Sequence, residues 1–589
     1  MMIIRGQWTW VVLLTVGWLV YANSMEGVFV YDDLPSIVEN DDLRRVFDRS
    51  QWGTWSSVPH SSIDGRPLVR LTLALNYTFG GLHVWGYHAV NIAIHLLCGL
   101  LYMALLRLLL GDIWLAFVCA LLWLVHPLHS ECVNYIVVRT ETLMGLCYLA
   151  TLNCALRQGW GWALAAICCC MAGMTAKESM VTAPLAALML DRALAQKTCL
   201  ELVRRRWVLY MGLCVSWVVL AALLWHGRRG DSAGLEHVGV WDYLLNQSWV
   251  LADYGWKVFW PHPLALDYGY VRPLSLLVVA PEALVLLVVG TLTLWGLWRN
   301  RLVGTAMALV FLTLAPTSSL LPIATEVGAE RRMYLALAAL LPVLVTGLLL
   351  LLQRVLGAVQ LRWVGMALAS IVVLAFAGIT ARRNLDYRSE KTLWQSAVQA
   401  VPDNARAHNN LALALQAEGK LEEAVLSYRR ALELNPNMSQ AHNNLGGSLY
   451  RLRRLPEAIA VLRQALVVRP YFLEARYNLG QALLGVGEYE QAVMHLRQVL
   501  VVEPDMFAAR FKTGEALLGL GRVDEALANF VRAGQLRPDD IDTRLYLGRA
   551  YEQLGRALEA ADTYRRVLEL QPSNAFALER IAAIGTVVE

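Results

Sequence analysis

The sequence predicts an all-α protein with two parts, a polytopic bundle of membrane helices followed by an α-solenoid of helical repeats. Hydrophobic residues make up 57% of the 589 residues, more than a soluble globular protein normally carries. They concentrate in long apolar stretches before Ala381, whereas charges recur every few residues from Arg382 onward. Prolines recur at a fixed interval through the second part. We therefore expect a membrane domain at residues 1–381 and a repeat domain at residues 382–589.

The apolar stretches predict about eleven membrane spans between residues 8 and 380, judged with a window of about 19 residues. The first stretch, Trp8–Tyr21, follows Arg5 as in a signal peptide, but the residues after it form a poor cleavage site. We therefore expect an uncleaved first helix. Lys and Arg cluster in alternate short loops, which indicates a cytoplasmic amino terminus. An odd number of spans then places the repeats on the non-cytoplasmic side, either the periplasm of a bacterial inner membrane or the lumen of the endoplasmic reticulum.

Composition excludes several other classes of protein. The formal net charge is only +4, and neither part carries a basic face large enough to bind nucleic acid. All 10 cysteines lie between Cys98 and Cys214, mostly inside apolar stretches. Cysteines with metal-type spacing and polar neighbours are absent, so we expect neither a disulfide framework nor a zinc site.

Unusual polar residues gather at the outer ends of the predicted spans. They are Asp32, Asp33, His126, His129, Glu131, Arg139, Glu141, Lys177, Glu178, Glu326, Glu330, Arg331 and Arg332. Charged side chains at membrane depth are costly, so such residues usually mark a functional site. Taken singly, each could equally pair with a lipid headgroup or with a neighbour. Their gathering on one face favours a shared site.

The residue types in this set suit glycosyl transfer from a lipid-phosphate carrier. The carboxylates of Asp32 and Asp33 suit a general base that deprotonates an acceptor hydroxyl. Arginine and lysine suit the phosphate whose negative charge grows as it leaves. No Gly-rich nucleotide-binding fingerprint is present, which agrees with a lipid-linked sugar donor. A divalent metal could assist at Asp32, Asp33 and Glu131, but this ligand set is too small to predict a metal site.

The second part carries the signature of the tetratricopeptide repeat. Its prolines keep the period of this repeat, 34 residues, at Pro402, Pro436, Pro470, Pro504, Pro538 and Pro572. Alanines that pack a helix pair keep the same register from Ala424 to Ala560, and glycines from Gly446 to Gly548 permit close helix approach. We expect a partial repeat that includes Trp394, five full repeats, and a capping helix at residues 574–585.

A row of side-chain amides is predicted on the concave face of the repeats. Asn410, Asn444 and Asn478 each stand one position before a core leucine. Amides there could hydrogen-bond an extended peptide backbone without regard to its sequence, which would make the groove a binding site for an acceptor protein. The alternative, which has equal weight, is that they are solvated groove residues without a ligand.

Short motifs in the first part match, in order, those of a known family. They are Tyr31-Asp32-Asp33, Arg66-Pro67-Leu68, Gly86-Tyr87-His88, His126-Pro127-Leu128-His129-Ser130-Glu131, Arg139-Thr140-Glu141, Lys177-Glu178 and Ala329-Glu330-Arg331 with Tyr334. In this combination they resemble the transmembrane and tetratricopeptide-repeat O-mannosyltransferases, which are glycosyltransferases of the GT-C fold. Ser130 and Arg332 depart from the family's usual threonine and aliphatic residue. The resemblance covers nearly the whole chain.

The resemblance implies an enzyme that moves a sugar, mannose in the characterised members, from polyprenyl or dolichyl phosphate to Ser/Thr hydroxyls of proteins. Asp32 would be the base, with Asp33 as the close alternative and Glu131 as a second acidic group. The carrier phosphate would be bound by Arg139, Lys177 and Arg331. The supporting residues would be Arg66, His88, His126, His129, Glu141, Glu178, Glu330 and Tyr334.

Two other functions stay open on the sequence alone. A lipopolysaccharide ligase or polysaccharide polymerase can also join membrane helices to tetratricopeptide repeats, and it would use a carrier pyrophosphate. A non-catalytic scaffold could use the repeats to assemble an envelope or secretion complex. The polar loop at residues 24–85, with its aspartate pair, favours an enzyme over a scaffold, because a scaffold has no use for carboxylates at the membrane surface.

Overall fold

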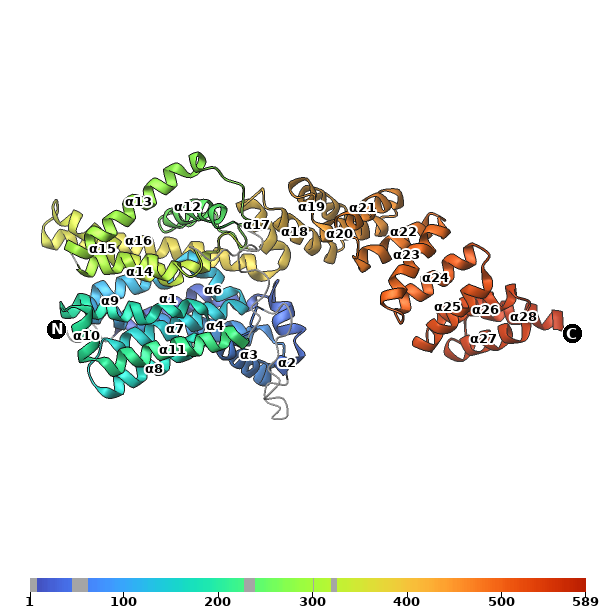
Figure 1. The fold of residues 1–589 in the computed structure, drawn as a ribbon, viewed down its shortest axis with the longest axis horizontal. Coiled ribbons are helices and arrows are strands. Elements are labelled where there is room, and N and C mark those ends of the chain that lie inside the picture. Colours follow the sequence, from blue (N-terminus) through green and yellow to red (C-terminus); the bar gives the residue numbers. More distant parts are fainter. Residues whose placement is uncertain (1–7, 45–61, 227–238, 300, 319–325, 589) are drawn as a thin grey trace. The chain divides into compact units, whose positions relative to one another are not determined.

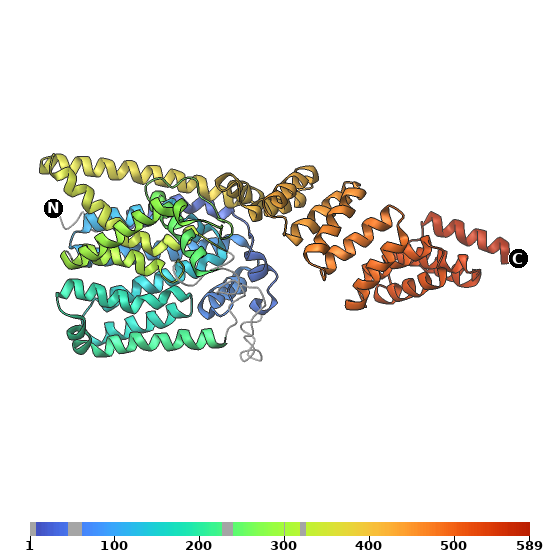
Figure 2. The same cartoon turned by 45° about the horizontal axis from the view of Figure 1, so that its top comes forward.

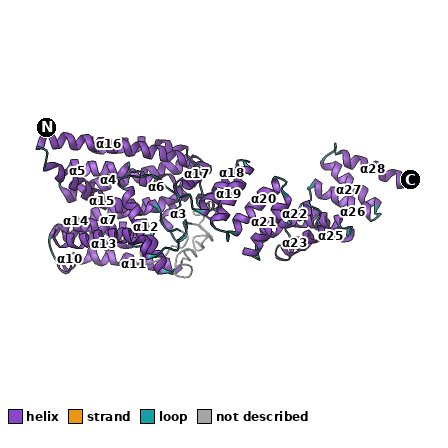
Figure 3. Ribbon diagram, turned by 90° about the horizontal axis from the view of Figure 1, so that it is seen from above, coloured by secondary structure: helices purple, strands orange, loops and turns teal. Residues whose placement is uncertain are grey.

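The computed structural model describes residues 8–44, 62–226, 239–299, 301–318 and 326–588. Every regular element in these ranges is helical (Figure 3), which confirms the predicted all-α class. The chain divides into two compact units, Met1–Asn404 and Ala405–Glu589. The expected change of character at residues 381/382 falls inside the last long helix of the first unit. That unit therefore also contains the helix that the repeat pattern assigns to a partial repeat.

The first unit is a bundle of helices of very different lengths (Figures 1 and 2). Its α-helices are α1 (Thr9–Tyr21), α2 (Asp41–Arg44), α3 (Pro67–Gly80), α4 (Val84–Leu110), α5 (Ile113–Leu124), α6 (Ser130–Asn134), α7 (Arg139–Ala155), α8 (Trp160–Met174), α9 (Ala183–Ala195), α10 (Cys199–Arg205), α11 (Trp207–His226), α12 (Val240–Lys257), α13 (Leu276–Arg299), α14 (Arg301–Leu314), α15 (Met333–Gln353), α16 (Ala358–Asn384) and α17 (Glu390–Ala400).

Among the described residues, 5 helices are long and apolar enough to cross a membrane by length and composition. They are Val84–Leu110, Trp207–Trp225, Leu276–Arg299, Glu330–Gln353 and Ala358–Arg388. A pair bent by 54°, Ile113–Leu124 and Pro127–Asn134, raises the number to 6 if it is one span. The expected count of about eleven spans is not confirmed, because several apolar stretches form helices shorter than the ~20 residues that a span needs. The first of them, α1, has 13 residues.

Apolar side chains remain exposed on the outside of this bundle. Leu277, Leu287 and Trp298 on α13 are all largely exposed. Soluble proteins rarely leave so long an apolar surface uncovered, and surfaces of this kind mark contact with a membrane or a partner. Together with the length of the apolar helices, this surface gives the first unit the character of a membrane domain.

Buried polar side chains tie the long helices of the bundle together. Tyr102 on α4 donates a hydrogen bond of 2.7 Å to the carbonyl of Ala338 on α15. Trp123 on α5 donates to the carbonyl of Tyr334 over 3.0 Å, and the ring of His95 on α4 bonds the Tyr334 hydroxyl at 2.9 Å. An unpaired polar group is costly in such apolar surroundings. These bonds therefore fix α4, α5 and α15 relative to one another.

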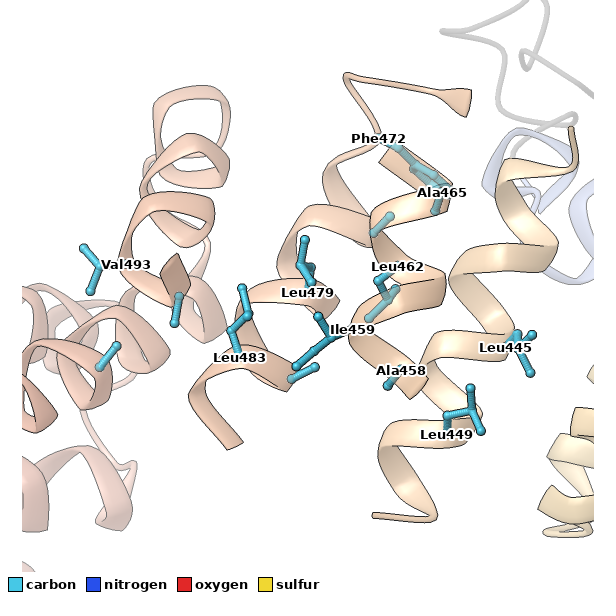
Figure 4. Packing of buried hydrophobic residues seen from close by; sticks show 14 of the residues in the cluster. Leu445, Leu449, Ala458, Ile459, Leu462, Ala465, Phe472, Leu479, Leu483 and Val493 are labelled. Atoms are coloured by element: carbon cyan, nitrogen blue, oxygen red, sulfur yellow. The ribbon is translucent and has the colours of Figure 1, made fainter. Parts of the chain in front are cut away.

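In the described residues, the second unit is a solenoid of five helix pairs followed by a closing helix. The pairs are α18 (Ala405–Ala417) with α19 (Leu421–Leu434), α20 (Ser439–Arg451) with α21 (Leu455–Val468), α22 (Leu473–Gly485) with α23 (Tyr489–Val502), α24 (Phe507–Gly519) with α25 (Val523–Leu536), and α26 (Ile541–Gln553) with α27 (Ala557–Leu570), before α28 (Ala575–Val588). Leu445, Ala458, Leu462 and Leu479 pack in the continuous core of neighbouring pairs (Figure 4).

Close packing of each helix pair depends on a glycine. A Cβ on Gly446 would overlap the Leu462 side chain, and a Cβ on Gly480 would lie 2.7 Å from Leu496 Cγ. Gly447, on the same helix as Gly446, has no such neighbour within 4 Å. We expect Gly446→Ala to destabilise the protein by about 1–3 kcal/mol through overpacking. Gly447→Ala should stabilise it by about 0.5–1 kcal/mol, because alanine is the better helix former.

Thermal unfolding of the two variants measures this difference. A change of 1 kcal/mol shifts the unfolding midpoint by roughly 2–4 °C in a domain of this size. Gly446→Ala should unfold at a lower temperature than the unsubstituted protein, and Gly447→Ala at a higher one. Shifts of the same sign in both variants would contradict the packing described here.

Candidate functional site

The aspartate pair lies in the loop after α1, between the short helices η2 (Ala22–Glu26) and η3 (Leu34–Val38). Asp32 is partly exposed, and its backbone N–H donates a 3.0 Å hydrogen bond to the Tyr135 hydroxyl. Asp33 is fully buried: Oδ2 accepts from the Val30 N–H at 3.0 Å, and Oδ1 accepts from the Val137 N–H at 2.9 Å. Both oxygens of Asp33 thus fix the loop, and Asp32 is the aspartate that reaches the surface.

Burial raises the pKa of Asp33 from its ordinary value of 3.8 to about 8, although the backbone N–H groups oppose the shift. The folded protein therefore binds the proton of Asp33 more tightly than the unfolded chain does. The stability that the protonated carboxyl contributes is lost as the pH rises from 3.8 to about 8. We expect Asp33→Asn, which cannot ionise, to destabilise the protein less and less as pH rises. The difference in unfolding free energy should change by up to about 1.4 kcal/mol per pH unit.

Thermal unfolding of the full chain between about pH 5 and pH 8 tests the behaviour of Asp33, since the raised pKa lies at the upper end of this range. Asp539→Asn is the matched control, because Asp539 is exposed in the second unit. Its effect gives the baseline for replacing an exposed aspartate. A constant difference between Asp33→Asn and the unsubstituted protein would contradict the preference for a protonated carboxyl.

The second acidic group, Glu131, lies in α6 and is buried. Its carboxylate accepts hydrogen bonds from the Arg331 guanidinium and, over 3.0 Å, from the Arg331 backbone N–H. The same guanidinium donates to both oxygens of Glu326, at 2.7 and 2.6 Å. About 21% of the Arg331 side chain remains exposed. A partly exposed cation is therefore held between two carboxylates.

Two further ion pairs involve predicted site residues. Lys177 and Glu141 form a pair in which the side chains are only 11% and 5% exposed. Arg66 lies 3.5 Å from Glu178, and this pair is more exposed. Motifs that are distant in the sequence thus contact one another through these two ion pairs. The Lys177–Glu141 pair is the more deeply buried, so it depends more strongly on both partners.

One short segment, from Glu131 to Glu141, brings most of the predicted site together. Cys132 within it interacts electrostatically with Glu131, Glu141, Lys177 and Arg331. The aspartate loop binds the same segment through its bonds to residues 135 and 137. Carboxylates and cations from four distant parts of the sequence therefore meet around this segment.

Arg139, which begins α7, is fully buried and bound to neutral groups. It donates to the side-chain oxygens of Asn91 and Asn76, both at 2.6 Å, and to the Tyr87 carbonyl at 3.0 Å. The Asp33 carboxyl also interacts electrostatically with the Arg139 guanidinium. Direct contact between Arg139 and a phosphate would require the side chain or its surroundings to move.

The predicted supporting histidines lie in the interior. The His129 ring centroid lies 4.6 Å from Trp123 and 4.8 Å from Tyr334, and His126 packs beside it at 6.2 Å. His88 on α4 is also fully buried. Sequence motifs placed these residues at the outer membrane face. The tertiary structure buries all three side chains.

Sequence analysis missed a chain of polar residues around Glu330. Glu330 Oε1 accepts from the Ala265 N–H at 2.7 Å and from the Tyr268 hydroxyl at 2.9 Å. Lys257 donates to the Tyr268 hydroxyl at 2.5 Å and to Asp253 at 2.6 Å. Lys257 and Tyr268 also line a cavity of about 250 Å³. The i,i+4 spacing of Asp253 and Lys257 was the available signal.

The donor set does not fit a metal ion. No group of three or more His, Cys, Asp or Glu in the described part of the chain is placed to hold one. Of the three acidic residues considered as ligands, Asp33 and Glu131 accept hydrogen bonds from protein groups instead. No metal therefore enters the mechanism proposed below.

The predicted amide row in the second unit has neighbouring amides as partners. Asn410 accepts from Asn409 at 3.0 Å, and Asn444 accepts from Asn443 at 3.4 Å. Asn478 donates to Asn443 over 2.8 Å. Part of the hydrogen-bonding capacity of the row is therefore used within the solenoid, and the adjacent Asn409 and Asn443 belong to the same polar strip.

The second unit is a tetratricopeptide-repeat domain. Family models described as "Tetratricopeptide repeat" match residues 377–438, 410–471, 477–541 and 517–580. Among solved structures, the TPR protein YrrB, titled as having an unusual peptide-binding site, is 24% identical with a TM-score of 0.30. The match covers 32% of this chain and 96% of YrrB. The chain is thus an apolar helical bundle joined to tetratricopeptide repeats.

The chain is homologous to the transmembrane and tetratricopeptide-repeat protein O-mannosyl-transferases, which confirms the resemblance seen in its motifs. Protein O-mannosyl-transferase TMTC2 of Homo sapiens is 25% identical, with 71% of this chain and 61% of that protein covered. Drosophila melanogaster Tmtc3 is 26% identical, with 70% and 54% covered. Human TMTC1 is 26% identical, with 71% and 54% covered. The matches therefore span little more than half the length of these relatives.

Proposed function

We propose that this chain is a membrane glycosyltransferase of the GT-C type that moves a sugar from a polyprenyl or dolichyl phosphate to Ser/Thr hydroxyls of proteins. The names of its relatives favour mannose as the sugar. The observation that carries the proposal is that the aspartate loop and the ion pairs of Arg331 and Lys177 all attach to the segment from Glu131 to Glu141. A base and a phosphate clamp are the two parts that this transfer requires.

In the proposed reaction, the Asp32 carboxylate accepts the proton of the acceptor hydroxyl. The hydroxyl oxygen forms a bond to the anomeric carbon while the bond from that carbon to the phosphate oxygen breaks. The bonding electron pair leaves with the carrier phosphate, so the anomeric configuration is inverted. Attack and departure on opposite faces of the sugar place base and phosphate on opposite sides of it.

Arg331 and Lys177 stabilise the growing charge of the departing phosphate. Guanidinium groups bind phosphate through two parallel hydrogen bonds, whereas lysine acts as a point charge. About 21% of the Arg331 side chain is exposed, and Glu131 and Glu326 pair with its guanidinium. These carboxylates hold the guanidinium in place in the absence of substrate. Arg139, which contacts neutral groups, contributes positive potential from beneath the loop.

The acceptor protein and the location complete the proposal. We assign acceptor binding to the concave face of the repeats, with Asn410, Asn444 and Asn478 offering amides to an extended backbone. The positive loops favour a cytoplasmic amino terminus. The aspartate loop and the repeats then lie on the non-cytoplasmic side of a bacterial inner membrane or of the endoplasmic reticulum, where lipid-linked sugars are presented.

The test is transfer by the purified full chain in detergent. The donors are polyprenyl-phosphate mannose, polyprenyl-phosphate glucose and a polyprenyl-pyrophosphate sugar, each radiolabelled. The acceptors are Ser/Thr-rich peptides and matched peptides with alanine at every hydroxyl position. We expect label in the hydroxyl peptides from a monophosphate donor only. Transfer only from the pyrophosphate donor, or none from any donor, would contradict the proposal.

A further inference from the structure

The residue before the proposed base has an unusual backbone. Tyr31 has a φ of +49°, in the left-handed region that side chains other than glycine rarely adopt. Such a conformation persists only where surrounding contacts hold it, and it is found preferentially at functional sites. The contacts that hold Tyr31 therefore also set the direction in which Asp32 leaves the loop.

Those contacts come from α17, the helix that the repeat pattern assigns to a partial repeat. The Tyr31 N–H donates to Glu390 Oε1 over 3.3 Å. The Tyr31 ring meets the Trp394 ring edge to face, with centroids 5.3 Å apart and an interplanar angle of 80°. Glu390 begins α17, and its helix start is capped by Ser389, whose hydroxyl accepts from the Thr392 N–H at 3.1 Å. The capped start of α17 therefore contacts both the backbone and the ring of Tyr31.

The segment before α17 holds the earlier part of the same loop. The Val28 N–H donates to the Tyr387 carbonyl at 3.3 Å. The Asn384 side chain donates to the Val20 carbonyl at 2.9 Å and to Asn23 Oδ1 at 2.8 Å. Arg388 and Glu26 form an ion pair. Residues 384–394 thus follow the loop from residue 20 to residue 31, all within the first unit.

The repeat register explains why α17 is available for this contact. Positions 34 residues apart from Trp394 are Tyr428, Leu462, Leu496, Phe530 and Tyr564. The last four of these side chains lie against Gly446, Gly480, Gly514 and Gly548, on the first helix of their own repeat. The same register places the first helix of the partial repeat at residues 371–383, inside α16. A Cβ on Gly378, the glycine position of that stretch, would meet nothing within 4 Å, so Trp394 does not pack there. Trp394 packs against Tyr31 instead, so the aspartate loop takes the place that the glycine of the first helix has in the full repeats.

We propose that Glu390 and Trp394 are positioning residues that hold Asp32 in its working orientation, so that the aspartate loop completes the first, partial repeat. This inference rests on the proposed function, in which Asp32 is the base. The helix α17 then has two functions. Its sequence follows the register of the repeats, and its first turns contact the aspartate loop. If Trp394 served only to pack the partial repeat, any apolar side chain of similar size at position 394 would replace it without loss of activity.

The test uses full-length variants with two readouts. In Trp394→Leu the side chain is one that intact repeats carry at this position, as at Leu462 and Leu496, so repeat packing is kept while the ring contact is lost. Trp394→Tyr keeps an aromatic ring, as at Tyr428. Glu390→Gln weakens the bond to the Tyr31 N–H by removing the charge. Gln399→Ala, at an exposed position of the same helix, is the control.

We expect Trp394→Leu and Glu390→Gln to lower kcat by about 10- to 100-fold, because small displacements of a catalytic group have effects of this size. KM for the lipid donor should stay unchanged, and Trp394→Tyr should recover most of the activity. Gln399→Ala should match the unsubstituted protein. Wild-type kcat in both Trp394→Leu and Glu390→Gln, in a protein that transfers sugar, would overturn the inference and leave the proposed function standing.

Hydrogen–deuterium exchange of residues 24–36 gives the second readout, which needs no activity. Loss of the grip on Tyr31 should speed exchange of this segment in Trp394→Leu and Glu390→Gln, and leave it unchanged in Gln399→Ala. Unchanged exchange in both variants would show that α17 does not hold the loop, whether or not transfer is detected. Failure of the unsubstituted protein to transfer from any donor would instead contradict the proposed function.

Discussion

Asp32→Asn is expected to lower kcat for sugar transfer by about 10²- to 10⁴-fold, the range that a general base contributes. Asparagine has nearly the same shape as aspartate but cannot accept the proton of the acceptor hydroxyl. KM for the lipid donor should change little, because the phosphate is assigned to Arg331 and Lys177. Initial rates with the labelled monophosphate donor, at several donor and peptide concentrations, separate the two effects.

Asp33→Asn is the matched control for the Asp32 substitution. Both oxygens of Asp33 accept backbone N–H groups, and an asparagine amide cannot accept at both positions. We therefore expect this variant to lose stability, and to keep most of its kcat at a temperature where it remains folded. The reverse result, with Asp33→Asn inactive and Asp32→Asn active, would move the base to Asp33.

The second large effect concerns the buried pair of Lys177 and Glu141. Lys177→Met leaves the Glu141 carboxylate buried without its cation, and such a change typically costs about 3–5 kcal/mol. Replacing both partners, in Lys177→Met/Glu141→Leu, should recover most of that stability, because apolar residues of similar volume substitute for buried pairs at little cost. Transfer should stay strongly reduced in the double variant, because Lys177 is assigned to the carrier phosphate.

Thermal unfolding and donor KM together measure both parts of this prediction. Arg429→Met is the control, because the pair of Arg429 and Glu457 is 46% and 45% exposed. Exposed pairs contribute about 0–1 kcal/mol, so this variant should unfold almost normally. Wild-type stability in Lys177→Met would show that the pair is dispensable. Wild-type KM and kcat in the double variant would remove Lys177 from the donor site.

Local patterns were sufficient to predict the repeats. Their prolines, alanines and glycines recur at one period, and each repeat packs mainly on its neighbours. The same pattern assigned α17 to a partial repeat from Trp394. The period identifies a helix as part of a repeat, however, and does not predict which residues outside the repeats pack against it. The contact between Trp394 and Tyr31 joins residues far apart in the sequence, so no local pattern contains it.

The span count was not confirmed, and the surroundings of the individual site residues could not be predicted. Hydropathy counts apolar stretches, but the length of each helix depends on where the chain turns. Motifs brought Arg139 into the site alongside Arg331. The structure gives them different surroundings, with neutral amides around Arg139 and two carboxylates around Arg331. The contact of Lys257 with Tyr268 was missed because Tyr268 lies beyond the end of the helix that carries Lys257.

The sequence by itself determined the all-α class, the repeat register and the residue types of the candidate site, because these follow from composition and from spacing along one helix. Only the tertiary structure decided that Asp33 is buried while Asp32 reaches the surface, and that α17 grips the loop before Asp32. The physical reason is that exposure and hydrogen-bond partners are set by groups distant in sequence. Val137, Glu390 and Trp394 act on the aspartate loop only once the helices have packed.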